Sequence, residues 1–565
     1  MMGHSSQTTE KRKGFYIMLE AMIEASPRPD GTCMQEIYLE GRLADQARNT
    51  GGIDDDRMLE LLKSCEGFRQ LVHSIGVSIH SEEEDISSVR FALENWGKTN
   101  KYTSGSRIEA VCPADGSETI LKLSDFNLTA EDDVPGKFTF EFHRAGALAT
   151  VNIIFYLNDG YDAPELKPDA PVAFESEAYR DMIRRSLLHA GNNYRLKKAI
   201  EKAKRGQDVT IAYIGGSITQ GAGAKPIHST CYAYQSYSLF KQLFGQNGGE
   251  HIHFVKAGVG GTPSELGMIR YERDVLKNDS VQPDIVIIEF AVNDADDETE
   301  GRCYESLALK ALAADNKPAV ILLFSVFMND WNLQDRLSPV GLHYDLPMVS
   351  VKDAVVEQFY LSQEEGNLVT KRQYFYDTYH PTNIGHRIMA DCLALLFAET
   401  DQAASHTEDI DLHKPPVIGN DFIDIQLLDR VTNINAAHIN EGGFSETDTE
   451  LQMVEMDDQS HGTPQFPHNW MHTAESGNDS FSMMITCKKL VIVYKDSGST
   501  DFGTIDIWDN GQLIKQADAR AIQWTHCHAS ILFNEQEARE HHIEIRMTDG
   551  HEQKKFTILG FGYVK

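Results

Sequence analysis

The central part of the chain, residues 176–402, alternates short apolar runs with longer stretches of helical periodicity. Apolar runs of strand length lie at 209–214, 253–257, 284–290 and 319–327. Stretches with the three- and four-residue apolar spacing of an amphipathic helix lie at 176–204, 232–244, 264–276, 304–314 and 381–398. Strands that alternate with helices form a parallel sheet with helices on both faces. We therefore predict an α/β domain over 176–402 that binds its ligand at the carboxyl ends of the strands.

The two flanking segments have patterns that predict β-rich domains. In residues 1–175 a helical stretch at 57–76 precedes alternating phenylalanines at 138–142 and a turn signal at 158–160, which together predict a β-sandwich with helical additions. A polar linker at 401–416 follows the central domain. Residues 410–565 contain short strands separated by turn signals, which predict a C-terminal jelly-roll-like sandwich.

Charge and hydropathy narrow the classes of partner. With 52 Lys and Arg against 85 Asp and Glu, the formal net charge is −33, which argues against nucleic-acid binding and against docking on anionic membranes. The sequence has neither an apolar run of transmembrane length nor a recognisable export signal, so we expect a cytoplasmic protein.

Cysteine and histidine spacing gives no metal pattern. The eight cysteines form no C-x-x-C pair and are expected to be reduced thiols. The histidine-bearing stretches at 461–472, 526–528 and 541–542 do not have a standard zinc spacing. We therefore predict no metal and no other cofactor.

Four short blocks could carry chemistry, and the first is the glycine-rich stretch 214–221 directly after an apolar run. It places Ser217 at a strand-to-helix junction, where a side chain can be exposed and the backbone N–H lies near a helix N-terminus. The glycines allow a substrate to approach the backbone. Taken alone, the block also fits a structural turn or a phosphate loop, although no complete phosphate-binding motif is present.

The second and third blocks follow the next apolar runs along the chain. Residues 257–264 contain Gly261, whose backbone N–H is a candidate oxyanion donor, although a tight turn is the simpler alternative. Residues 289–294 contain Asn293, whose side-chain amide is a second candidate donor, although asparagine is also a common turn residue.

The fourth block is a loop that leads into the predicted helix 381–398. Asp377 stands three residues before His380, and Pro381 opens the helix. In this spacing a carboxylate can hold the imidazole Nδ1–H and leave Nε2 free to take a proton. Helix capping by either residue is the alternative.

Together the blocks supply a full set of groups for acyl transfer at one edge of the sheet. The predicted catalytic groups are the nucleophile Ser217, the base His380 and its orienting carboxylate Asp377. The predicted oxyanion donors are the backbone N–H groups of Ser217 and Gly261 and the side chain of Asn293.

In order along the chain, these blocks resemble those of the SGNH (GDSL-type) hydrolase superfamily. The closest resemblance is to bacterial carbohydrate O-acetylesterases that carry accessory β-sandwich domains. It implies a three-layer α/β/α domain with a parallel sheet, flanked here by N-terminal and C-terminal β-sandwiches, and esterase activity without a metal. Two positions depart from the usual pattern: Gly216 replaces the Asp of the common G-D-S block, and Lys256 stands where Asn often opens the second block.

The resemblance implies a serine acetylesterase acting on acetylated oligosaccharides, such as imported fragments of plant polysaccharides. Three aromatic residues near the blocks could stack on sugar rings or simply pack: Trp331, Tyr344 and Tyr379. The C-terminal sandwich could bind carbohydrate, shape the rim of the cleft, or serve docking and homo-oligomerisation. Two other functions stay open: another SGNH activity, such as that of a lysophospholipase, thioesterase or acyltransferase, or a non-catalytic carbohydrate-binding protein.

Overall fold

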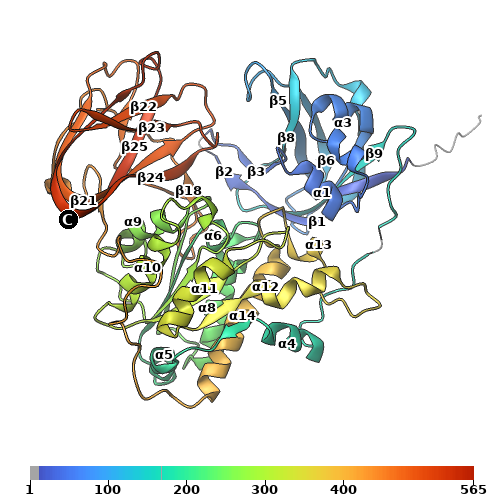
Figure 1. Ribbon diagram of the computed structural model, residues 1–565. Helices are drawn as coiled ribbons and strands as arrows, with labels where there is room; N and C mark the ends of the chain where they lie inside the picture. The colour runs from blue at the N-terminus through green and yellow to red at the C-terminus, as the bar shows by residue number, and fades with distance from the viewer. Residues whose placement is uncertain (1–11, 29, 167) are drawn as a thin grey trace, which may run out of the picture. The chain divides into compact units, whose positions relative to one another are not determined.

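The computed structural model describes residues 12–28, 30–166 and 168–565, and these form two compact units (Figure 1). The first unit comprises the chain up to Pro171 together with Thr370–Tyr379. The second comprises Val172–Val369 and His380–Lys565, and so contains the predicted C-terminal domain and the predicted α/β domain except for residues 370–379. The three domain ranges predicted above, 1–175, 176–402 and 410–565, stay predictions.

The first unit contains two antiparallel sheets, of order β1-β9-β4-β7 and β2-β3-β8-β5-β6. Its strands are β1 (Gly14–Glu24), β2 (Ser26–Pro27), β3 (Cys33–Tyr38), β4 (Val72–His80), β5 (Ser88–Gly97), β6 (Arg107–Pro113), β7 (Asp115–Lys122), β8 (Asp132–Phe142) and β9 (Leu148–Leu157). Its helices are α1 (Leu43–Asn49), α2 (Asp56–Leu61), α3 (Cys65–Leu71) and α13 (Lys371–Tyr374). One hydrophobic core takes side chains from both sheets, including Phe140 and Phe155.

The predicted continuous helix at 57–76 is wrong. The chain leaves α2 after Leu61, and the Ser64 side chain accepts a hydrogen bond from the Gly67 N–H at 3.1 Å, which caps a new helix, α3. From Val72 the backbone pairs with Leu157 as strand β4, because sheet pairing there replaces the helical bonds. The apolar spacing was therefore correct for two short helices and misleading beyond them.

The α/β domain is built on a six-stranded sheet of order β10-β15-β14-β13-β11-β12. Its strands are β10 (Leu187–His189), β11 (Val209–Gly215), β12 (Ile252–Gly258), β13 (Ile285–Glu289), β14 (Ala319–Phe324) and β15 (Met348–Ser350). All neighbours pair in parallel except β10, which is antiparallel to β15. The predicted parallel sheet is confirmed, while the short edge strand β10 interrupts the helical stretch expected at 176–204.

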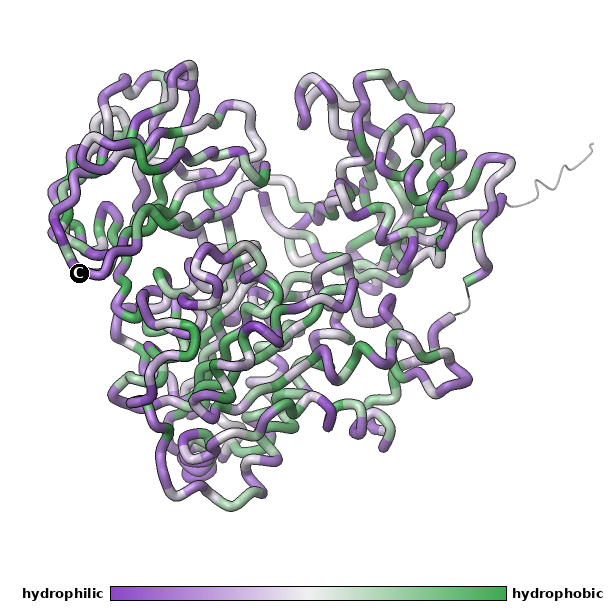
Figure 2. The backbone as a smooth tube through the Cα atoms, viewed as in Figure 1, coloured by the Kyte–Doolittle hydropathy of each residue, from purple (hydrophilic) through white to green (hydrophobic). Residues whose placement is uncertain are grey.

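Helices cover both faces of this sheet. They are α4 (Glu177–Arg184), α5 (Tyr194–Lys204), α6 (Ser217–Gln220), α7 (Ile227–Thr230), α8 (Tyr232–Phe244), α9 (Ser264–Asp274), α10 (Arg302–Leu312), α11 (Gln334–Tyr344), α12 (Val351–Val355) and α14 (Asn383–Gln402). On β11 the Tyr213 hydroxyl lies 2.9 Å from Ser236 Oγ of α8, while Ile214 shares a hydrophobic core with Leu266 of α9. Successive strand residues point to opposite faces, so α8 and α9 lie on opposite sides of the sheet. The strands of this sheet are buried and largely hydrophobic, and in Figure 2 green marks hydrophobic segments here as in the other parts of the chain.

The C-terminal β domain has an eight-stranded antiparallel sheet with the main order β16-β25-β21-β24-β22-β23, on which β17 pairs with β21 and β20 pairs with β25. Its strands are β16 (Gln426–Leu428), β17 (Ala437–Asn440), β18 (Met453–Val454), β19 (Thr463–Pro464), β20 (Trp470–His472), β21 (Phe481–Asp496), β22 (Thr504–Asp509), β23 (Gln512–Asp518), β24 (His526–Met547) and β25 (Phe556–Val564), with β18 and β19 forming a separate pair. One hydrophobic cluster joins Leu266 of α9 to Val491 and Leu559 of this sheet. The two domains of the second unit therefore share a core, whereas the jelly-roll topology stays a prediction.

No helix within the described ranges combines the length and the apolar character that a membrane-spanning helix requires.

Candidate active site

Ser217 begins α6, immediately after β11 ends at Gly215. The turn is tight, because a Cβ on Gly215 would lie 2.1 Å from Thr219 Oγ1 and a Cβ on Gly216 would lie 2.2 Å from Asn293 Oδ1. Only glycine fits at these two positions without a shift of the neighbouring groups. The turn leaves Ser217 half-buried at the carboxyl edge of the parallel sheet.

The His380 ring reaches this serine. His380 Nε2 lies 2.9 Å from Ser217 Oγ, although 163 positions separate the two residues in sequence. His380 stands in the loop before α14, where the Thr382 side chain caps the helix by accepting the Gly385 N–H at 3.2 Å. A distance of 2.9 Å is within the range for proton transfer from a serine hydroxyl to an imidazole.

Asp377 belongs to the first unit, which includes residues 370–379. It is buried, and its Oδ1 accepts the Tyr379 N–H at 2.8 Å. Its Oδ2 lies 3.4 Å from Arg42 Nη1, and the same guanidinium lies over the Tyr379 ring at 4.9 Å. The pairing of Asp377 with His380 stays a prediction.

The second and third blocks adjoin the turn that carries Ser217. The Gly260 N–H donates to Gln220 Oε1 at 3.1 Å, which ties the second block to the last residue of α6. Gly261 is exposed and has φ +70°, a conformation that favours glycine. The side chain of Asn293 packs against Gly216. The structure thus brings the first three blocks and His380 to one edge of the sheet.

Comparison with known proteins agrees with this geometry. Residues 213–388, which include Ser217, Gly261, Asn293 and His380, match the GDSL-like Lipase/Acylhydrolase family. The chain contains a GDSL-like hydrolase domain. The family resemblance predicted from the four blocks is therefore confirmed.

Solved structures show the same architecture over a larger part of the chain. A two-domain esterase (CEX) active on acetylated mannans has a TM-score of 0.58 and 26% identity, over 68% of this chain and 99% of that chain. A second structure, of CEX co-crystallized with mannopentaose, has a TM-score of 0.56 and 27% identity, over 68% of this chain and 98% of that chain. A comparison with curated proteins gave no match.

Beside α6, the GDSL-like domain holds a buried glutamate that sequence reasoning missed. The Glu289 carboxylate accepts hydrogen bonds from the Ser325 hydroxyl and, at 3.1 Å, from the Thr219 hydroxyl of α6. Burial raises the pKa of Glu289 from 4.5 to about 7, and the two hydroxyl donors limit that rise. A glutamate ending an otherwise apolar strand, Ile285–Glu289, was the available signal.

Two other acidic groups of the GDSL-like domain are buried near the third block. Burial, followed by the nearby Asp297 charge, raises the pKa of Asp294 to about 8 and that of Glu265 to about 10. Asp294 also accepts the Ser264 N–H at 2.8 Å, which connects the third block to the start of α9.

The three aromatic residues predicted to contact sugar have different surroundings. Trp331 is half-buried and stacks on Phe327 with ring centroids 5.7 Å apart, and Tyr379 is exposed. Tyr344 is 1% exposed, and its hydroxyl donates to Glu305 at 2.7 Å. A ring with so little exposed surface cannot stack on a sugar, so the proposal of a sugar contact at Tyr344 is withdrawn.

Trp524 is an aromatic residue at the site that sequence reasoning missed. It precedes β24 of the C-terminal β domain, is 42% exposed and stacks on His526 with ring centroids 4.4 Å apart. Its ring lies so close to Gly261 that a Cβ there would be 2.5 Å from Trp524 Cζ2. Nothing in the local sequence connects Trp524 to a turn more than 260 positions earlier, so only the fold reveals it.

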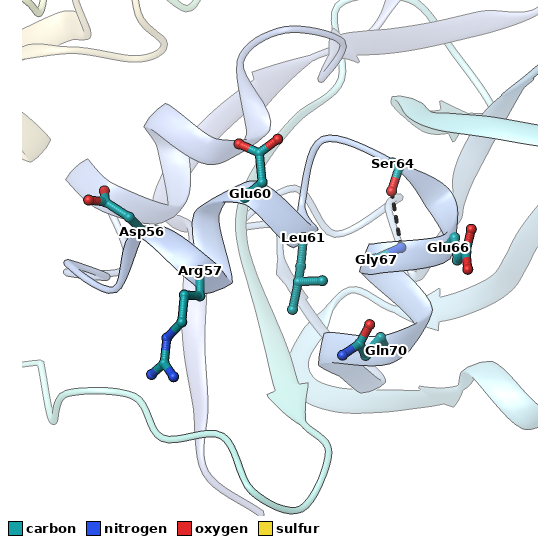
Figure 3. Close-up of a pocket in the computed structure, with 8 residues that line it drawn as sticks. All are labelled: Asp56, Arg57, Glu60, Leu61, Ser64, Glu66, Gly67 and Gln70. Carbon is teal, nitrogen blue, oxygen red and sulfur yellow. Dashed lines mark hydrogen bonds between the residues drawn. The ribbon is translucent and has the colours of Figure 1, made fainter.

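Clusters of metal ligands and other pockets are alternative kinds of functional site. In the described part of the chain, no cluster of three or more His, Cys, Asp and Glu side chains is arranged to hold a metal ion. A cavity of about 720 Å³ lies in the first unit along α2 and α3, and Figure 3 shows its lining residues, which include Arg57, Glu60 and Gln70. None of the predicted site residues lines that cavity.

Proposed function

We propose that this protein is a serine esterase that removes O-acetyl groups from oligosaccharides through an acyl-enzyme. The observation that carries the proposal is the 2.9 Å contact between His380 Nε2 and Ser217 Oγ at the carboxyl edge of the parallel sheet. A hydroxyl beside an imidazole is the arrangement that activates serine for nucleophilic attack.

In the proposed cycle His380 takes the Ser217 proton while Oγ attacks the ester carbonyl, and Asp377 orients and stabilises the imidazolium. The N–H groups of Ser217 and Gly261 and the amide of Asn293 stabilise the oxyanion that forms. His380 then protonates the leaving sugar hydroxyl and activates the water that releases acetate. Each oxyanion donor accounts for about 3–4 kcal/mol of transition-state stabilisation in enzymes of this type.

The direct test is turnover of p-nitrophenyl acetate by the Ser217→Ala variant. We expect turnover to be abolished with the fold intact, because the substitution removes the hydroxyl that His380 Nε2 contacts. Ser229→Ala, which changes a serine of α7, is the matched control and should keep its turnover. A Ser217→Ala enzyme that still turns over, or that still reacts with a serine-directed phosphonate, would reject the assignment.

The carbohydrate substrate is supported by the likeness to CEX, which is active on acetylated mannans, and by Trp524 beside Gly261. An exposed indole offers a flat apolar face, on which a pyranose ring can stack. We expect Trp524→Ala to raise KM for acetylated mannan oligosaccharides, and this fold-increase should be about ten times the fold-increase in KM for p-nitrophenyl acetate. Ile522→Ala, which changes an exposed residue of the same loop, should leave that ratio unchanged.

Acyl-chain length separates this proposal from the other hydrolase activities. Acetate release from acetylated mannan, xylan and sialoside oligosaccharides, followed by mass spectrometry, would identify the sugar. A preference for long-chain acyl esters or thioesters would instead indicate a lysophospholipase or thioesterase. Failure of the serine-directed phosphonate to label the protein would indicate a non-catalytic carbohydrate-binding protein.

A further inference from the structure

A buried glutamine of the C-terminal β domain contacts the glycine turn of the second block. Gln452 Nε2 donates to the Gly260 carbonyl oxygen at 2.8 Å, and Gln452 Oε1 accepts the Cys527 N–H at 2.9 Å. The side chain is 8% exposed. Because one partner is an acceptor and the other a donor, only one orientation of the amide satisfies both contacts. Gln452 therefore joins β24 to the second block through two directed hydrogen bonds.

The contact matters because of which carbonyl it holds. The Gly260 carbonyl and the Gly261 N–H belong to the same planar peptide unit and point in opposite directions. Fixing the carbonyl oxygen therefore fixes the direction of the N–H that is proposed to bind the oxyanion. A hydrogen bond accepted by the carbonyl also polarises that N–H and makes it a stronger donor.

Without this contact, little in the turn itself would hold the peptide. Glycine stands on both sides of the peptide bond, and Gly261, at φ +70°, is exposed, so the unit can rotate with small steric cost. The neighbouring contact, from the Gly260 N–H to Gln220 Oε1, fixes the preceding peptide and not this one.

We propose that Gln452 is a positioning residue that aligns the Gly260–Gly261 peptide for oxyanion binding. This inference rests on the proposed function, since it requires Gly261 to be an oxyanion donor. It gives the C-terminal β domain a part in the rate of acyl transfer, in addition to any contact with the sugar. Because the oxyanion develops in the transition state, loss of Gln452 acts on kcat and leaves KM nearly unchanged.

Two variants of Gln452 separate alignment from packing. Gln452→Met keeps the length and apolar volume of the side chain but removes the donor, and it should lower kcat on p-nitrophenyl acetate about tenfold, with KM within about twofold of wild type. Gln452→Glu places a carboxylate against the Gly260 carbonyl at neutral pH, whereas its protonated form can donate to that oxygen. Its kcat relative to wild type should therefore rise as the pH is lowered, a response that a packing role would not produce.

Gln465→Met is the matched control. Gln465 is a second buried glutamine of the C-terminal β domain. Its Nε2 donates to the Thr463 carbonyl at 3.3 Å, and its Oε1 accepts from Arg273 at 3.0 Å. Its replacement removes a buried amide without touching the second block, so it should lower the melting temperature and leave kcat unchanged. Titration with the phosphonate measures the concentration of competent active sites, and kcat is calculated per competent site. A partly unfolded variant is then not mistaken for a slow one.

The outcomes distinguish the two proposals. Gln452→Met with wild-type kcat, an equal loss of kcat in Gln465→Met, or a Gln452→Glu ratio that does not change with pH would each overturn the positioning role. If Ser217→Ala is inactive while Gln452→Met is unaffected, only the positioning role fails. If Ser217→Ala keeps its turnover, the proposed function itself fails.

Discussion

Glu289→Gln should remove a pH dependence of stability that this one buried carboxyl creates. Burial raises the pKa of Glu289 from 4.5 to about 7, so the folded state binds this proton more tightly than the unfolded state. An acid with a raised folded-state pKa contributes its stability at low pH, and that contribution is lost as the pH rises to the folded-state pKa. Above pH 7 the folded protein must hold a buried carboxylate, which the unfolded chain would solvate.

The pKa shift sets the size of the effect. One pKa unit corresponds to about 1.4 kcal/mol, so a rise from 4.5 to about 7 is worth about 3 kcal/mol over the whole titration. Between pH 5 and pH 8 the expected loss from this group is about 2–3 kcal/mol. Glutamine is close to isosteric and can still bond with the Ser325 and Thr219 hydroxyls, so the variant keeps the packing and loses only the titration.

Urea denaturation followed by fluorescence, at pH 5, 6, 7 and 8, measures the effect as the difference between wild type and Glu289→Gln. The difference isolates Glu289, because Asp294 and Glu265 titrate in both proteins. Glu450→Gln, which removes an exposed carboxylate, is the control and should follow the wild-type slope. Equal pH slopes for Glu289→Gln and wild type would refute the argument that burial of this carboxyl limits stability above neutral pH.

Three further substitutions test the site. Asn293→Ala should lower kcat on p-nitrophenyl acetate by about 10²–10³-fold with little change in KM, and steady-state rates near wild type would exclude it as an oxyanion donor. Gly261→Ala adds about 1–2 kcal/mol of strain at φ +70° and places a Cβ 2.5 Å from Trp524, so both kcat and the melting temperature should fall. Adding Trp524→Ala to this variant should restore part of the melting temperature. The absence of such a recovery would contradict the steric reasoning. Tyr344→Phe removes the hydrogen bond to Glu305 and should lower the free energy of unfolding by about 1 kcal/mol, whereas a raised KM for oligosaccharide would return Tyr344 to the sugar site.

The parts of the fold that the sequence predicts correctly depend on short stretches of chain. The apolar run at 209–214 forms β11 (Val209–Gly215). Five residues of the run are buried, and its β-branched residues favour strands. Ser217 and His380 were predicted to meet because glycine, serine and histidine stood where such runs end or a helix begins. Parallel strands bring those ends to one edge, which is why residues 163 positions apart meet at 2.9 Å.

The missed features depend on contacts that no local pattern contains. The helix expected at 57–76 ends early because Val72 pairs with Leu157, and that pairing competes with the helix only in the folded sheet. Gln452 reaches a carbonyl 192 positions away, in a segment whose sequence reads as ordinary polar loop. Tyr344 illustrates the converse, since its position near the blocks suggested exposure and its burial follows from the packing of α11.

The two departures from the usual family pattern are explained by contacts around the turn that carries Ser217. At Gly216 any side chain would collide with the Asn293 amide, so the absence of the usual Asp lets the third block pack directly on the first. Lys256 is buried, and its Nζ donates to the Gln220 carbonyl at 2.8 Å at the end of α6, while its backbone N–H donates to Asp457 of the C-terminal β domain at 3.0 Å. A buried ammonium is costly without such a partner, and the Gln220 carbonyl supplies one from within the GDSL-like domain, whereas Asp457, like Gln452, belongs to the C-terminal β domain. The C-terminal β domain thus contacts the chain at Lys256 and at Gly260 of the second block, and the GDSL-like domain alone would lack these two contacts.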